Sequence, residues 1–424
     1  MLVSDYNYDL PDERIAKFPP KERGSTRLLV LNRKTGAIQD SYYRNLDQFL
    51  NPGDVLILND TRVMQSRLFC ELPDGRRREL VVLERHGDEP QRVMYRGKLH
   101  EGDQLRIAQT MLDDNVSETA MVSRRLKTLS SRHSATNEER VSEVPPVTTG
   151  RDERAETVAF QSPSISVKRI LGNGIAEVES DVPLAELAEE YGTVPLPPYL
   201  HRDATDDDKK RYQTVWAKHM GSAAAPTASL NMTEDLLNRL KQKGVIVKYL
   251  TLHVGLGTFL PIRSDKVEDH HMHSEWYHIP DDTLDAIRAI QAGRESANAS
   301  LRGIRDNGSG RSEEPRNDGR DEASRRECIC DSRRRIVALG TTVARTLEYY
   351  ARTGKPEGED DIFIYPGFEF QLVDALITNY HAPKSTVLML ASAFAGWDHL
   401  KAAYDHALAE KYNFLSYGDS MLIC

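Results

Sequence analysis

Apolar positions along this chain of 424 residues follow either short continuous runs or a helical spacing. Short runs bounded by Gly, Pro, Asn or Asp predict strands, whereas apolar residues three or four positions apart predict helices. Residues 54–58 predict a buried strand, and 27–31 and 37–42 flank a Gly-containing turn that is typical of a hairpin. Short β-type runs between 67 and 110, completed by 166–179, have the spacing of a small antiparallel barrel.

The remainder of the chain alternates between helical and strand patterns. We predict helices over 181–191, 233–243, 280–292, 341–351 and 397–411, and strands over 245–253, 335–339 and near 413–417. Thr233 is expected to cap the second of these helices, and Thr341 and Thr342 the fourth. This pattern predicts an α/β fold, in which a large α/β domain is interrupted by a small inserted antiparallel β-barrel domain. The expected bounds are 1–62 and 181–424 for the α/β domain, and 63–180 for the barrel.

Two stretches of the chain contain no aromatic residue. They include residues 117–158 and 294–335, and neither shows a sustained period of 2 or 3.6. The second holds eleven Arg and nine Asp or Glu. Segments with so few bulky apolar side chains cannot offset the entropy of ordering them. We therefore expect two disordered-looking insertions, one in each domain.

Composition places the chain among soluble globular proteins. It is 39% hydrophobic and 29% charged, with a mean hydropathy of −0.55. No apolar run approaches the roughly 18–20 residues of a membrane span, and the N-terminal segment lacks the apolar core of a secretory signal. The four cysteines are too scattered for a disulfide framework, which favours a reducing compartment, and we expect a cytoplasmic protein. The net charge of −9 excludes a chain that is basic throughout, but not a local basic patch.

Two glycine-containing segments follow predicted strands. Gly255 and Gly257 lack the third glycine of a dinucleotide-binding loop, and a proline replaces the expected helix, so a Rossmann site is not predicted. Residues 339–342, with the sequence Leu-Gly-Thr-Thr, lie where a strand enters and a helix leaves. Free N–H groups there can hold a carboxylate or a phosphate, although a capped helix without a ligand explains the pattern equally well.

Histidines gather around residue 275. His270, His271, His273 and His278 accompany Glu275, but their spacing matches no zinc site, and we predict no metal. Imidazoles beside a carboxylate suit proton transfer, and the alternative is a set of surface histidines without a role.

Serine nucleophiles are a further possibility. Ser222 and Ser385 lie in loops, and His253 or His381 could serve as the base. The chain has no G-x-S-x-G elbow, so a hydrolase of the α/β type is poorly supported. Ser385 is expected instead to donate hydrogen bonds or to cap the apolar run that follows it.

Several strings, taken in order, resemble one family. They include NPGDVLILNDTRV, PLPPYLHR, GSAAAPTAS, TLHVGLGTF, HHMHSEW, IVALGTTVARTLE and TNYHAPKST. In this order they are similar to the S-adenosylmethionine:tRNA ribosyltransferase-isomerases of queuosine biosynthesis. The resemblance covers 1–110, 166–293 and 335–424, and we expect the two aromatic-poor stretches to be additions particular to this chain.

The resemblance implies a reaction and its partners. The family transfers and isomerises the ribosyl part of S-adenosylmethionine onto 7-aminomethyl-7-deazaguanine at the tRNA wobble position, which gives epoxyqueuosine and releases adenine and methionine. S-adenosylmethionine is then a co-substrate, and no cofactor is expected. The partners are tRNA and S-adenosylmethionine without a membrane, and we expect a monomer.

The reaction needs several proton transfers, which favours His, Glu or Asp over a metal. The catalytic candidates are His253, His273, Glu275 and His381. The candidates for binding substrate are Asp60, Arg62, Tyr212, Gln213, Thr214, Ser222, Thr227, Gly257, Thr258, Phe368, Asn379, Lys384, Ser385, Thr386 and Asp419. Among these, Tyr212 or Phe368 would stack on a base, and Asp60, Arg62 or Asp419 would hold ribose hydroxyls or the methionine ammonium.

One departure from the family pattern bears on activity. Where a histidine is expected, the chain has Asn231, which forms hydrogen bonds but does not titrate. This change supports an alternative, namely a catalytically impaired relative that only binds tRNA or a nucleoside. For tRNA, the turn with Arg76, Arg77 and Arg78 is the expected phosphate contact, and a solvated hairpin tip is its alternative.

Overall fold

The structure is a computed structural model that describes residues 1–83, 90–108, 163–172, 174–255, 262–306 and 334–424. Side chains are not described for 295–306. The predicted insertion at 117–158 therefore lies outside the described residues, as do Gly257, Thr258 and most of the stretch 294–335.

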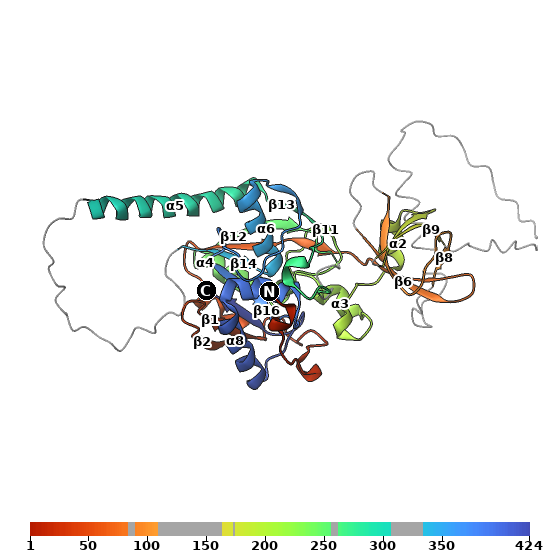
Figure 1. The fold of residues 1–424 in the computed structure, drawn as a ribbon, viewed down its shortest axis with the longest axis horizontal. Helices are drawn as coiled ribbons and strands as arrows, with labels where there is room; N and C mark the ends of the chain where they lie inside the picture. Colours follow the sequence, from red (N-terminus) through yellow and green to blue (C-terminus); the bar gives the residue numbers. More distant parts are fainter. Residues whose placement is uncertain (84–89, 109–162, 173, 256–261, 307–333) are drawn as a thin grey trace, which may run out of the picture. The chain divides into compact units, whose positions relative to one another are not determined.

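A nine-stranded sheet forms the centre of the larger unit of the described chain (Figure 1). Its order is β15-β13-β12-β3-β14-β16-β17-β1-β2. The strands are β1 (Arg27–Leu31), β2 (Ile38–Tyr42), β3 (Val55–Asn59), β12 (Ile246–Leu252), β13 (Glu275–His278), β14 (Ile336–Leu339), β15 (Glu357–Asp360), β16 (Ala375–Asn379) and β17 (Ser420–Ile423). The predicted hairpin is confirmed, because β1 and β2 pair in antiparallel fashion from Arg27 opposite Tyr42 to Leu31 opposite Ile38.

The four central strands, β12, β3, β14 and β16, are parallel to one another. Their carboxyl ends therefore lie at one edge of the sheet, where ligands bind in open α/β folds. Strand β17 runs antiparallel to β16, with Ser420 opposite Asn379, and β1 runs parallel to β17. The amino ends of β17 and β1 consequently reach the same edge.

Helices cover both faces of this sheet. They are α4 (Glu234–Gln242), α5 (Asp281–Asp306), α6 (Thr341–Thr353), α7 (Thr386–Ala395) and α8 (Trp397–Ala409), whereas the short helix α3 (Asp206–Arg211) contributes to neither core. Alternate residues of β3 belong to two separate cores: Val55 and Ile57 pack with α5, α6, α7 and α8, whereas Leu56 and Leu58 pack with α4. Because β3 is buried on both faces, it reads as a continuous apolar run, as the sequence predicts.

The smaller sheet closes into a barrel, which confirms the predicted fold class. Its strands are β5 (Arg67–Glu71), β6 (Arg77–Val82), β7 (Arg92–Arg96), β8 (Gln104–Ile107), β9 (Ser164–Gly172) and β10 (Ile175–Ser180). The strand order is β10-β7-β6-β5-β8-β9. A separate pair, β4 (Thr61–Val63) and β11 (His219–Ser222), is parallel.

The chain divides into two compact units. One consists of Met1–Arg67, Val81–Gly87 and Thr193–Cys424, and the other of Leu68–Leu80 and Asp88–Gly192. The expected boundaries were 62/63 and 180/181. The division falls at 67/68 and 192/193 instead, and at the second of these α2 (Leu184–Tyr191) groups with the barrel.

Several local predictions are wrong. The last strand is β17, not 413–417, and helix α5 continues to Asp306 instead of ending near 292, so the second aromatic-poor stretch begins as helix. Gly340 is the N-cap of α6, where Thr341 and Thr342 were expected. In contrast, Thr233 caps α4 as predicted, because its Oγ1 accepts a hydrogen bond from the Leu236 N–H at 3.1 Å.

The scattered cysteines argued against a disulfide framework, but they did not exclude a single disulfide bond. Of the two cysteines that the structure describes, Cys70 is a free, buried thiol and Cys424 is disulfide-bonded. Burial raises the pKa of Cys70 to about 12. The expected cytoplasmic location therefore gains no support from the cysteines. Among the described helices, none combines the length and the apolar character that crossing a membrane requires.

Candidate functional site

Polar side chains fix the carboxyl edge of the parallel strands. At the end of β3, the Asn59 amide donates to the Leu252 carbonyl at 2.9 Å and accepts from the Leu252 N–H at 3.1 Å and the Thr61 N–H at 3.0 Å. Asn59 is fully buried. The Asn59 side chain thus holds the end of β12 beside the end of β3. His253 is the residue that follows β12.

A cavity lies beyond the carboxyl ends of β14 and β16. Its lining comes from segments that are far apart in the sequence: Tyr199, 225–228, Val254, 340–342, 378–382, Ser385, Val387, Leu415 and Ser416. Four of the predicted site residues take part, namely Thr227, Asn379, His381 and Ser385. A second hollow, on α6 and α7, includes Thr341, Thr342, Arg345 and the predicted Thr386.

Helices α6 and α7 both begin at this cavity, but their N-termini differ. At α7, Ser385 is a conventional cap, because its Oγ accepts from the Leu388 N–H at 3.2 Å and donates to the Ala382 carbonyl at 2.7 Å. This confirms the capping role predicted for Ser385, whereas its role in substrate binding stays a prediction. At α6 the N-cap is Gly340, at φ 103°, which has no side chain to cap the helix. The first N–H groups of α6 therefore have no side-chain acceptor from the N-cap residue.

His381 lines the cavity at the end of β16. Its Nε2 lies 2.8 Å from the Thr378 Oγ1, and its backbone N–H donates to the Tyr404 hydroxyl at 2.9 Å. The Tyr8 hydroxyl donates a short hydrogen bond to the His381 carbonyl. Burial lowers the pKa of His381 to about 3. The imidazole is consequently neutral near pH 7 and is able to accept a hydrogen bond.

His253 follows β12, which β3 and β14 separate from β16 in the sheet, and it lies beside the end of β3. Its Nδ1 is 2.8 Å from the Thr61 Oγ1, and its ring stacks on Trp276 with centroids 5.2 Å apart. Gly221 also packs against the ring, where an added Cβ atom would come within 2.6 Å of it. The imidazole is therefore held in one orientation, although it is not part of the cavity lining.

Glu275 belongs to a buried ion network rather than to the cavity. The Arg345 guanidinium lies 3.2 Å from the Glu275 Oε2 and 3.0 Å from the Asp360 Oδ2. The Glu275 Oε1 accepts from the Gly255 N–H at 2.8 Å. Burial raises the pKa of Asp360, and the Arg345 charge opposes that shift. This network fixes Gly255, whereas His273 is exposed.

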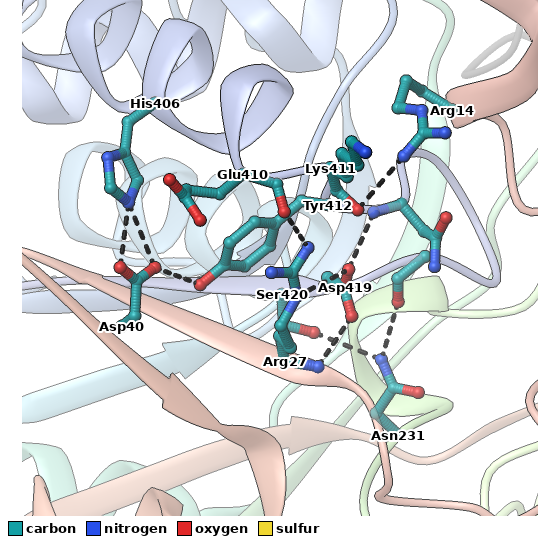
Figure 2. A network of polar contacts seen from close by, with 12 residues as sticks. Arg14, Arg27, Asp40, Asn231, His406, Glu410, Lys411, Tyr412, Asp419 and Ser420 are labelled. Atoms are coloured by element: carbon teal, nitrogen blue, oxygen red, sulfur yellow. Dashed lines mark hydrogen bonds and ion pairs between the residues drawn. The ribbon is translucent and has the colours of Figure 1, made fainter.

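Asp419 is a buried anchor between the sheet and a neighbouring loop (Figure 2). Its Oδ1 accepts from the Arg27 N–H at 2.6 Å, and its Oδ2 accepts from the Asn413 N–H at 2.7 Å. Burial raises its pKa, and these two hydrogen bonds oppose the shift. Its carboxylate oxygens thus hold the backbone in place, and its carbonyl is 3.5 Å from the Asn379 amide nitrogen.

Asn231 lies in the same network (Figure 2). Its amide nitrogen donates to the Gly418 carbonyl at 3.0 Å and to the Ser420 Oγ at 3.2 Å. The side chain is buried, with 2% of its surface exposed. Asn231 therefore ties the loop before α4 to the start of β17.

Other predicted binding residues are engaged in packing or backbone contacts. Tyr212 is fully buried with Tyr417 in a small core, so it does not present a ring for stacking. The Gln213 amide makes two hydrogen bonds to the Val63 backbone, and the Asp60 Oδ1 accepts from the Thr251 hydroxyl at 2.7 Å.

The remaining four predicted binding residues also lie away from the cavity lining. Thr214 is buried, and Arg62 is exposed on β4. Phe368 lies under the Arg352 guanidinium, which is 3.9 Å from the ring centroid. Lys384 is exposed, and its backbone has a left-handed φ of 56°.

Neither candidate serine has the geometry of an activated nucleophile. The Ser222 Oγ donates to the Ala224 carbonyl at 2.7 Å and accepts from the Val254 N–H at 2.8 Å. Ser385 caps α7. Since the hydrogen bonds described for both hydroxyls involve the backbone and not a histidine, the hydrolase interpretation has no structural support.

Sequence reasoning left several cavity residues out of the site. The Leu-Gly-Thr-Thr pattern did signal residues 340–342, because a strand enters and a helix leaves there. Tyr199 and Ser416 carried no such signal. Their hydroxyls form a short hydrogen bond between loops more than 200 positions apart, and only the fold brings them together.

Comparisons with known proteins identify the class of the chain. The family model described as "Queuosine biosynthesis protein" matches residues 3–299 and 322–423. This match runs through the first aromatic-poor stretch, and the part of the second that it leaves out is 300–321. The chain belongs to this family.

Named relatives are similar over the full length. The chain is 42% identical to the S-adenosylmethionine:tRNA ribosyltransferase-isomerase of Pelodictyon phaeoclathratiforme and 43% identical to that of Chlorobium chlorochromatii, with 100% of both chains covered in each case. A solved S-adenosylmethionine tRNA ribosyltransferase from Thermotoga maritima is 27% identical, over 99% of this chain and 100% of that one, with a TM-score of 0.44.

The depressed pKa of His381 predicts a pH-dependent stability. An unfolded histidine titrates near pH 6.5, so below that pH the unfolded state binds a proton that the folded state excludes. The contribution of neutral His381 is therefore complete above pH 6.5 and is lost as pH falls toward 3, by about 1 kcal/mol per unit. The free energy of unfolding, measured by urea titration, should fall between pH 7 and pH 5 by about 1 kcal/mol less in His381→Gln than in the wild type.

The control for this measurement is His271→Gln, at an exposed position. It should keep the wild-type pH dependence. Equal losses in the wild type and His381→Gln would contradict the assignment of a neutral imidazole with a lowered pKa.

Proposed function

We propose that this chain is an S-adenosylmethionine:tRNA ribosyltransferase-isomerase. It transfers the ribosyl part of S-adenosylmethionine to the aminomethyl group of 7-aminomethyl-7-deazaguanine in tRNA and rearranges it to epoxyqueuosine, with loss of adenine and methionine. The observation that carries this proposal is the cavity at the carboxyl edge of β14 and β16, with neutral His381 in its lining. The full-length similarity to enzymes of this name supports the same reaction.

The reaction assigns proton transfers to groups at this edge. Protons beside a sulfonium are acidic, so a base is needed at the ribose 5′ carbon, and the departing adenine needs an acid. Its low pKa makes His381 a weak base, so we assign to its neutral ring a hydrogen bond to the substrate. His253 is oriented by Thr61, Trp276 and Gly221, and it is our candidate for the proton-transfer group.

The buried network assigns Glu275 a positioning role. It holds Gly255, and with it the start of the next loop, while Arg345 balances its charge. No metal site is part of this proposal, and S-adenosylmethionine acts as a co-substrate.

The alternative, an impaired relative that only binds, rested on Asn231 and on the two long insertions. Asn231 donates hydrogen bonds to Gly418 and Ser420, so its side chain has a structural role in this chain. The relatives with full-length similarity carry the name of the active enzyme. We therefore favour the enzyme.

Substitution of His253 tests the proposed function. Purified wild-type protein, given S-adenosylmethionine and tRNA with the aminomethyl precursor, should release adenine in proportion to the tRNA modified. His253→Ala should slow the release about 100-fold or more, because general acid–base groups typically contribute that much. Chromatographic adenine quantification and nucleoside mass spectrometry provide the two readouts.

The matched control is His406→Ala, on the outer surface of α8, where the imidazole pairs with Asp40. It should keep wild-type rates. Folded wild-type protein that releases no adenine with competent tRNA would refute the proposed function, and a His253→Ala variant at full rate would refute the role of His253.

The barrel turn offers a basic surface for tRNA. Arg76 pairs with Asp74, and Arg77 pairs with Glu71 at 3.1 Å; both guanidinium side chains are largely exposed. Arg78 differs, because it is buried and donates to the carbonyls of Lys98 and Arg77. We therefore keep Arg76 and Arg77 as phosphate contacts and assign Arg78 to the barrel structure.

Substitution of Arg77 should weaken tRNA binding without changing the chemistry. A lost phosphate contact lowers affinity for all sequences and reduces the slope of log K against log salt by about 1. Filter binding of precursor tRNA at several salt concentrations measures both quantities. The control is Arg288→Ala on α5, also an exposed arginine paired with one carboxylate. An unchanged salt slope for Arg77→Ala would remove the turn from the tRNA interface.

A further inference from the structure

The N-terminus of α6 combines three features that point to a ligand. Helix α6 has thirteen residues and begins with a glycine N-cap, so its first N–H groups face the cavity end without a capping side chain. The Thr342 Oγ1 is buried and has no hydrogen-bond partner among the described residues. The Asn379 Oδ1 is equally without a partner in the described chain, and Asn379 is only 2% exposed.

Buried polar atoms are normally satisfied, so two orphaned oxygens on one cavity imply a partner that binds there. The N–H groups at the start of a helix, with the positive end of its dipole, favour an anion. The start of α7 offers no comparable site, because Ser385 already occupies it as a cap.

The charge of the cavity selects the kind of anion. Its described lining contains no Asp, Glu, Lys or Arg, and His381 is neutral. A phosphate with one or two negative charges usually requires Arg or Lys in addition to a helix end. The α-amino acid group of methionine, by contrast, carries one carboxylate and one ammonium and is neutral as a whole. Such a zwitterion needs dipoles of both signs, which the helix N–H groups and the amide oxygen supply.

We propose that residues 340–342 at the start of α6 bind the α-carboxylate of the methionine part of S-adenosylmethionine, and that the Asn379 Oδ1 accepts a hydrogen bond from its α-ammonium. The Thr342 hydroxyl donates to the carboxylate. This assignment rests on the proposed function, and it places the amino acid end of the co-substrate beside His381. It also gives Gly340 a reason to be the N-cap, since a side-chain cap would compete with the carboxylate.

Two ligands that differ in one group test the assignment. S-adenosylmethionine and its decarboxylated analogue share the adenosyl, sulfonium and amino groups, and only the first has the carboxylate. Equilibrium dialysis should show that the wild type prefers S-adenosylmethionine by about tenfold or more, the effect of a charge-assisted hydrogen bond. Thr342→Val should lose most of that preference while binding the analogue as the wild type does.

Further variants separate a specific contact from a packing defect. Thr342→Ser keeps the hydroxyl and should keep the preference, and Thr353→Val, at the far end of α6, should change nothing. Asn379→Leu should lower the affinity for both ligands alike, because both carry the ammonium.

Each other outcome has a defined meaning. If the wild type binds both ligands equally well, the carboxylate subsite is refuted and the proposed function is untouched. If Thr342→Val weakens both ligands equally, Thr342 acts through packing and the subsite is again refuted. A folded wild type that binds neither ligand would refute the proposed function itself, and the subsite with it.

Discussion

The site depends on strand β3, which is fully buried between two cores and has a polar clamp at each end. At its start, Asp54 accepts hydrogen bonds from the buried Arg335, including one at 2.6 Å from Nη2, and this pair joins β3 to the residue before β14. At its end, Asn59 holds Leu252 of β12. A buried ion pair of this kind strongly resists the loss of either partner. The two clamps fix the register of three parallel strands, and their carboxyl ends meet at one edge.

That edge explains why distant segments form one site. His253, Gly340 and Asn379 lie at the carboxyl ends of β12, β14 and β16, respectively. Strand β17 runs antiparallel to β16, so Asp419, just before its start, lies at the same edge. Most polar groups there satisfy each other, as Asp419 and Asn231 do. By contrast, the first N–H groups of α6 have no side-chain cap, and the Asn379 amide oxygen has no partner among the described residues. These are the groups that we propose to bind the ligand, whereas the satisfied groups hold the backbone in place.

The pattern of apolar positions correctly predicted the features that depend only on nearby residues. The buried strand at 54–58, the Thr233 cap and the inserted barrel follow from patterns within a few residues, and the resemblance identified the family. Periodicity failed where tertiary contacts decide. Tyr212 was proposed to stack on a base, yet it packs with Tyr417, 205 positions away. Similarly, no local pattern distinguishes Arg78, which reaches the Lys98 carbonyl, from the exposed Arg76.

The central claim is that the chemistry takes place at the carboxyl edge of β14 and β16. A crystal structure with S-adenosylmethionine bound tests it most directly. The account predicts that the methionine carboxylate lies within hydrogen-bond distance of the first N–H groups of α6 and that the ribose approaches His381. A ligand bound instead in the barrel, or at this edge with its methionine end turned away from α6, would contradict it.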